Sequence, residues 1–159
     1  MDGVRPTLAA CAGFLLGVLW MDLMFDAQAL GLPGHVPEPA LASIAAYYRR
    51  VTTEAWPMGA LIGTVMAVAV VGALWQALRA PRLSSVAALL LITLPTALAL
   101  GRVFPNAMRL GARGDTVAMQ AALARGIGRD HLACLAAVLA FLALQVISPR
   151  REHPRHKVG

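Results

Sequence analysis

Four long apolar stretches constrain this chain more than any other feature. They cover residues 7–25, 57–78, 84–100 and 131–147, and polar or Pro/Gly-containing segments separate them. Each is close to the roughly 20 residues that a helix needs to cross about 30 Å of hydrocarbon. Of the 159 residues, 58% are apolar, which exceeds the apolar share of a soluble domain. The alternating pattern of a membrane β-barrel is absent from the sequence.

We therefore predict an all-α integral membrane protein, an antiparallel four-helix bundle, with spans at about residues 7–28, 56–79, 84–103 and 129–148. These spans form one domain, residues 1–148, followed by a basic cytoplasmic tail, residues 149–159. Four spans place both termini and the turn Arg79–Arg82 on one side of the membrane. That turn and the tail carry arginines with almost no acids, which favours the cytoplasm. We expect a location in the bacterial inner (plasma) membrane with both termini cytoplasmic.

The formal charge of +6 does not indicate nucleic-acid binding. The arginines lie at predicted helix ends, and no aromatic residues interleave with them as a base-stacking surface requires. Basic residues beside spans are typical of membrane anchoring, so the lipid bilayer is the expected partner. Cys11 and Cys134 fall in spans of opposite direction, roughly 20 Å apart along the membrane normal, so we expect no disulfide.

Asp22 and Asp26, at the end of the first apolar stretch, are the most informative polar residues. Their spacing of four puts them on one face of a helix. An ionisable side chain at that depth is costly unless it pairs or lines a cavity, which makes it a candidate for function. Polar residues near the other three spans reach the same side of the membrane: Arg50, Glu54, Arg102, Asn106, Arg109, Arg129, Asp130 and His131. The sequence thus predicts a polar mouth at one end of the bundle.

Three interpretations of this polar mouth are open. The residues could be interhelical ion pairs that hold the helix ends together, or they could line a pocket for a small, partly apolar ligand. A metal site is the weakest interpretation, because HxxxH, ExxH and CxxC spacings are absent and methionine is usually core filler. Its ligands would be Asp22, Asp26, Glu54 and His131, with Met21, Met24, Met58 and Met108 at similar depth. We therefore assign no metal and no cofactor. On the helical wheel of the fourth span, Asp130 shares a face with small residues, and such a face suits close packing inside the bundle. We therefore expect Asp130 to lie further inward than His131.

The C-terminal half resembles a known family. Residues Phe104–Leu110 (FPNAMRL), a polar helix after them, and Arg129–Leu132 (RDHL) at the start of the last span are similar to the anthrone-oxygenase-like family of small four-span membrane proteins. The resemblance covers roughly residues 94–147 and does not extend to the N-terminal half. It implies four antiparallel helices and, in some members, oxidation of a phenolic anthrone-type substrate without a cofactor. By this resemblance, the candidate functional residues are Asn106, Arg109, Arg129 and His131.

Two functional hypotheses follow. In the first, a polar pocket at the bundle mouth binds a lipophilic small molecule. In its enzymatic form His131 is the base, oriented by Asp130 or Asp22, and arginines stabilise a phenolate. The other residues of the pocket would be Asp26, Arg50, Glu54, Arg102, Asn106, Arg109 and Arg129. In the second, the chain is a non-enzymatic accessory or assembly subunit of a membrane complex, or a homo-oligomer. The small-xxx-small patterns at Gly13–Gly17 and Gly59–Gly63 motivate this second hypothesis.

Overall fold

The computed structural model describes residues 3–31 and 36–147, and all regular structure in them is helical. The predicted basic tail, residues 149–159, lies outside the described residues. Four long helical units are apolar enough to cross a membrane, at Val4–Leu30, Trp56–Arg79, Leu83–Ala112 and Val117–Ile147. The elements in chain order are α1 (Val4–Leu30), α2 (Glu38–Arg49), η1 (Arg50–Glu54), α3 (Trp56–Arg79), α4 (Leu83–Leu98), η2 (Ala99–Val103), α5 (Phe104–Ala112) and α6 (Val117–Ile147).

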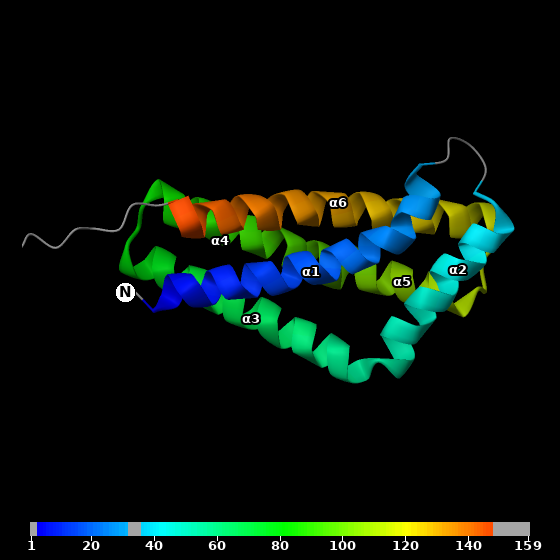
Figure 1. Ribbon diagram of the computed structural model, residues 1–159, viewed down its shortest axis with the longest axis horizontal. Helices are drawn as coiled ribbons and strands as arrows, with labels where there is room; N and C mark the ends of the chain where they lie inside the picture. The colour runs from blue at the N-terminus through cyan, green and yellow to red at the C-terminus, as the bar shows by residue number, and fades with distance from the viewer. Residues whose placement is uncertain (1–2, 32–35, 148–159) are drawn as a thin grey trace, which may run out of the picture.

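The four long helices pack as an antiparallel bundle, which confirms the predicted fold class. Helix α6 packs against α1 and α4, and α3 closes the ring by packing against the same two helices. The start of α1, the turn between α3 and α4, and the end of α6 lie at one end of the molecule (Figure 1). Helices α2 and α5 lie at the other end, where the two long connections run.

Two separate apolar clusters stabilise the molecule. The first, which we call the bundle cluster, joins the four long helices through Leu8, Ala12, Leu15, Ala69, Ala73, Ala88, Ile92, Val138 and Phe141. Small residues let the helices approach closely there. A Cβ atom on Gly72 of α3 would lie 2.8 Å from Cδ2 of Leu8 in α1. In a bilayer such close van der Waals packing is a main source of helix association.

The second cluster, the head cluster, lies beside α2 and α5. Its buried members are Ala29, Val36, Leu41, Ile44, Ala45, Tyr48, Val103, Ala107, Leu110, Ala121, Leu123, Ala124 and Ile127. Helix α6 has 31 residues, and at 1.5 Å per residue it is about 46 Å long, well beyond the roughly 30 Å of hydrocarbon. Its first half therefore belongs to the head and its second half to the bundle.

The connection from α2 to α3 is a π-helical turn followed by a break in the helix, and not a single proline kink. The sequence predicts one helix from Pro39 with a kink near Pro57. In the structure a π-helical turn, Arg50–Glu54, is followed by a break at Ala55, where φ is −96° and ψ is 40°. Pro57 then lies in the first turn of α3, where its missing N–H is tolerated. The chain changes direction at this break (Figure 1).

The third span continues through a second π-helical turn, Ala99–Val103, directly into α5. Pro105 falls in the first turn of α5 and does not end the helix. Arg113, with φ of 55°, ends α5 in the left-handed conformation. The sequence suggests Asp115 as the cap of the last helix, and this is wrong. Thr116 caps α6, because its Oγ1 accepts the N–H of Met119 at 3.3 Å.

Candidate functional site

A buried histidine, His131 in α6, lies between two carboxylates of α1. Its Nδ1 is 2.7 Å from Oδ2 of Asp26, and its Nε2 is 3.8 Å from Oδ2 of Asp22. The His131 and Asp26 side chains are 5% and 0% exposed, whereas that of Asp22 is 17% exposed. Asp22 and Asp26 both face His131 because they are four residues apart on one helix. The structure thus brings these three predicted residues together.

Two tyrosines from α2 complete the arrangement. The Tyr47 hydroxyl donates to Oδ1 of Asp22 at 2.6 Å, and the Tyr48 hydroxyl donates to Oδ1 of Asp26 at 2.6 Å. The Tyr47 ring also stacks on Phe25, with ring centroids 4.0 Å apart. Each carboxylate therefore lies between a phenol and the imidazole. We call this set the histidine cluster: Asp22, Asp26, Tyr47, Tyr48 and His131.

Both tyrosines act as neutral hydrogen-bond donors. Burial raises the pKa of Tyr47 above its ordinary value, and the adjacent Asp22 carboxylate raises it further. Burial raises the pKa of Tyr48 in the same way, and Asp26 adds to the shift. A negative charge on either phenol would be desolvated and next to another negative charge, which is why the protonated form is favoured. The two hydroxyl groups thus hold the carboxylates in place without titrating in the neutral range.

Tyr47 and Tyr48 were not among the residues predicted for the site. They are the two tyrosines of the chain and stand side by side before the second span. A usable signal was present, because consecutive helices joined by a short connection usually lie against each other. Residues shortly before the second span were therefore good candidates to contact the end of the first span.

Asp130 is buried and directly precedes His131 in the chain, but its side chain makes a different contact. Its Oδ2 lies 3.2 Å from Nε of Arg102 in η2, an ion pair that lacks hydrogen-bond geometry. The Asp130 side chain is 11% exposed against 5% for His131, so the prediction that Asp130 lies further inward is wrong. The reason is that α6 is covered on two adjacent sides. His131 faces α1 and Asp130 faces η2, and Asp26 makes the short contact that we expected from Asp130 or Asp22.

The remaining predicted residues do not join the histidine cluster. Arg50 and Arg49 both lie 3.7 Å from the exposed carboxylate of Glu54. Arg109 pairs with Asp115 at 3.0 Å. Arg129 is exposed and Asn106 is half-buried, and neither has a hydrogen bond or an ion pair to the cluster. The predicted polar mouth is thus one buried cluster with separate ion pairs around it.

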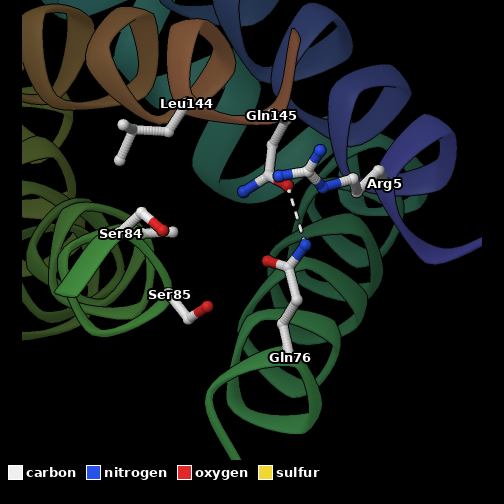
Figure 2. Close-up of a pocket in the computed structure, with 7 residues that line it drawn as sticks. Arg5, Gln76, Ser84, Ser85, Leu144 and Gln145 are labelled. Carbon is white, nitrogen blue, oxygen red and sulfur yellow. Dashed lines mark hydrogen bonds between the residues drawn. The ribbon is translucent and has the colours of Figure 1, made fainter. Parts of the chain in front are cut away.

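Two hollows stand out in the structure, and both lie away from the histidine cluster. The first, of about 10 Å³, lies at the opposite end of the bundle and is lined by Arg5, Gln76, Ser84, Ser85, Leu144 and Gln145 (Figure 2). There the Gln76 Nε2 of α3 donates to the Gln145 Oε1 of α6 at 3.2 Å, with both side chains buried. The space is enough for about one water molecule. The second hollow is an apolar groove of about 540 Å³ between α1 and α3.

The chemistry available at the histidine cluster is proton transfer. Asp26 engages one imidazole nitrogen, which leaves Nε2 directed toward the more exposed carboxylate, Asp22. A histidine held in this way by a carboxylate is suited to act as a general base. Within residues 3–31 and 36–147, no group of three or more His, Cys, Asp or Glu side chains is arranged to hold a metal ion.

The fold and the site together define a small, all-helical protein with four candidate membrane helices and a buried His–Asp–Tyr cluster. Comparisons of the chain with family models, curated proteins and solved structures find no match.

Proposed function

We propose that this chain is an integral protein of the bacterial inner membrane whose histidine cluster exchanges a proton with a small lipophilic molecule carrying a weakly acidic hydroxyl group. Both termini would lie in the cytoplasm, since the basic turn between α3 and α4 lies at the same end as the start of α1 (Figure 1). The observation that carries the proposal is the geometry of His131 between Asp26 and Asp22.

The two carboxylates have different roles in this proposal. Asp26 is fully buried, and its short contact to Nδ1 orients the ring. Asp22 is partly exposed and is 3.8 Å from Nε2, too far for a hydrogen bond between them. A hydroxyl group that approaches the exposed edge of Asp22 would come within reach of Nε2. His131 would then accept the proton while Asp26 stabilises the resulting imidazolium.

The surroundings of Asp22 favour a lipophilic ligand. Trp20, Met21 and Met24 are exposed on the same stretch of α1. Trp side chains are enriched at membrane–water interfaces, so this stretch is expected at the boundary between lipid and water. A ligand dissolved in the bilayer would reach Asp22 from that boundary.

A finer version of the proposal is oxidation of the ligand by O₂ without a cofactor, and it rests on the resemblance of residues 94–147 to the anthrone-oxygenase-like family. For an anthrone, removal of a proton gives an electron-rich phenolate-type anion that reacts with O₂. One atom of O₂ becomes the new carbonyl oxygen of the quinone product, and the other atom leaves as water. In this structure Arg102 is beside Asp130, so it is less available to the anion than the sequence suggested.

The test uses purified protein in lipid nanodiscs and an anthrone as the probe. The absorbance band of the bound anion and the uptake of O₂ are measured for the wild type, His131→Gln and the matched control Arg49→Gln. We expect the anion band in the wild type and the control and its loss in His131→Gln. General-base catalysis typically contributes a factor of about 10²–10⁴ in rate, so O₂ uptake should fall by at least that lower factor. An unchanged anion band in His131→Gln would refute the proposal.

A second candidate function, a non-enzymatic subunit of a membrane complex or a homo-oligomer, is favoured by a different observation. A Cβ atom added at Gly13, Gly17, Gly59 or Gly63 would meet nothing within 4 Å. Both small-xxx-small patterns are therefore unused in packing within the chain, and they remain accessible to another helix. Chemical crosslinking of wild type and Gly17→Leu in nanodiscs tests this function, which predicts a crosslinked product that the substitution removes.

A further inference from the structure

The apolar groove between α1 and α3 lies at the end of the bundle opposite the histidine cluster. Val4 and Leu8 of α1 form one side, and Val68, Val71 and Trp75 of α3 form the other. Its volume of about 540 Å³ falls in the range of small-molecule sites, roughly 300–1,000 Å³. Val68, Val71 and Trp75 are exposed, so the groove opens to the side of the bundle.

A close contact between α1 and α3 lines part of the groove. Leu8 of α1 lies directly over Gly72, where a Cβ would be only 2.8 Å from Cδ2 of Leu8. Leu8 is buried and lines the groove from the α1 side. The larger side chains of Val68, Val71 and Trp75 project beside this contact and form a wall.

The rim of the groove is positively charged. The guanidinium Cζ of Arg79 lies 4.2 Å from the centre of the Trp75 ring, so the cation is held at the end of the apolar wall. Arg82 follows in the turn to α4. The neighbouring segments that the structure describes, residues 3–8 and 67–83, contain no Asp or Glu, and Asp2 lies outside the described residues. A Trp–Arg pair at the end of a span is typical of the headgroup level of a membrane.

We propose that this groove binds one acyl chain of an anionic phospholipid, whose phosphate group contacts Arg79. The apolar wall from Val68 to Trp75 matches the hydrocarbon chain, and the cation at its end matches the phosphate. The Arg79 cation beside Trp75 favours an anionic lipid over a zwitterionic one. The site is separate from the histidine cluster and does not depend on the function proposed for it.

Fluorescence of Trp75 tests the site directly. The variant Trp20→Phe/Trp56→Phe retains Trp75 as the one tryptophan, because the chain has three. It is reconstituted in phosphatidylcholine nanodiscs with a small fraction of brominated phosphatidylglycerol or, in parallel, brominated phosphatidylcholine. Bromine quenches a neighbouring indole. One arginine near an anionic headgroup is expected to enrich the anionic lipid at the site about fivefold. The brominated anionic lipid should therefore give the same quenching of Trp75 at about one-fifth of the concentration that the zwitterionic lipid needs.

Matched variants separate a site from general attraction to the membrane surface. Arg79→Gln should abolish the preference for the anionic lipid, and Ala67→Phe, which fills the groove, should reduce quenching by both lipids. Arg82→Gln removes the same charge from the same turn and should keep most of the preference. Equal losses in Arg79→Gln and Arg82→Gln would overturn the proposal, as would equal quenching by the two lipids. A crosslinked dimer lost in Ala67→Phe would assign the groove to a second copy and overturn it as well.

Discussion

Oδ2 of Asp26 lies 2.7 Å from Nδ1 of His131, although 105 positions separate the two residues in the chain. The contact joins the first and the last long helix at the level where the bundle cluster meets the head cluster. It is therefore a polar link between two apolar cores.

Replacing Asp26 with Asn should strongly destabilise the protein. The buried carboxylate accepts the Tyr48 hydroxyl and contacts His131, and an amide has only one oxygen for these two partners. Breaking a buried pair by changing one partner typically costs roughly 3–5 kcal/mol. Asp22→Asn is the matched control, because Asp22 is partly exposed and the amide keeps an oxygen for the Tyr47 hydroxyl, so the variant loses mainly the charge assistance to that bond, about 1 kcal/mol. The free energy of unfolding, measured by detergent denaturation with circular dichroism, should separate the two variants, and equal losses would contradict this assignment.

Stability should decrease at alkaline pH because of the two tyrosines. The unfolded chain releases its phenolic protons near pH 10, whereas the folded state retains them, because the pKa of each tyrosine is raised. Below about pH 10 both states are protonated and these groups add no pH dependence. Above about pH 10 the unfolded state binds fewer protons than the folded state, so the free energy of unfolding falls as pH rises.

Tyrosinate absorbance at 295 nm measures this effect, since the chain contains only these two tyrosines. In the native protein the tyrosinate signal should appear only together with the loss of helical circular dichroism. Tyr47→Phe should halve its amplitude. A reversible native titration near pH 10, with the helices intact, would show that the two hydroxyl groups are not held as described.

The glutamine pair at the opposite end should contribute modestly to stability. Gln76→Leu leaves the buried amide of Gln145 without its partner. Polar contacts between membrane helices average about 0.6 kcal/mol, with a maximum near 1.7 kcal/mol, so the loss should fall in that range. The double variant Gln76→Leu/Gln145→Leu should recover part of the loss, because no unpaired amide remains. A double variant less stable than the sum of the single variants would argue against a direct bond.

Two glycines should respond to alanine with opposite signs. A Cβ at Gly111 of α5 would lie 2.8 Å from the backbone N and 2.9 Å from the Cα of Arg49 in α2. Backbone atoms cannot move aside cheaply, so Gly111→Ala should push the two helices apart and cost roughly 1–3 kcal/mol. At Gly126 of α6 a Cβ meets nothing within 4 Å. Gly126→Ala should therefore stabilise the protein by up to about 1 kcal/mol through helix propensity, as thermal unfolding would show.

The sequence predicts depth along the membrane normal well. Hydrophobic length identifies the four spans, and the number of residues from the apolar boundary gives the level of each polar side chain. That is why Asp22, Asp26 and His131 could be placed at one level before their contacts were known. Depth does not give the direction in which a side chain points around its helix, and the errors in the prediction are errors of direction.

The π-helical turns explain part of those errors. Each inserts one extra residue, which rotates the following side chains by about 100° relative to a regular helix. One such turn, Ala99–Val103, contains Arg102, which pairs with Asp130, while Arg109 beyond it pairs with Asp115. From the sequence, Arg102, Asn106 and Arg109 would share one face if a regular helix continued past Pro105. The other turn lies between Tyr48 and α3. The direction of the α2 side chains therefore does not follow from the helical wheel of the second span.

The long separation between Asp26 and His131 has a consequence for how the protein is made. At about 5–20 residues per second, a ribosome needs roughly 5–20 s to add the 105 residues that separate the two. During that time the carboxylate of Asp26 must stay hydrated, so the end of the first helix remains at the surface of the membrane. Only the arrival of the last helix supplies the imidazole and withdraws this carboxylate from water. The histidine cluster of the newly synthesised chain therefore forms only after α6 has been made.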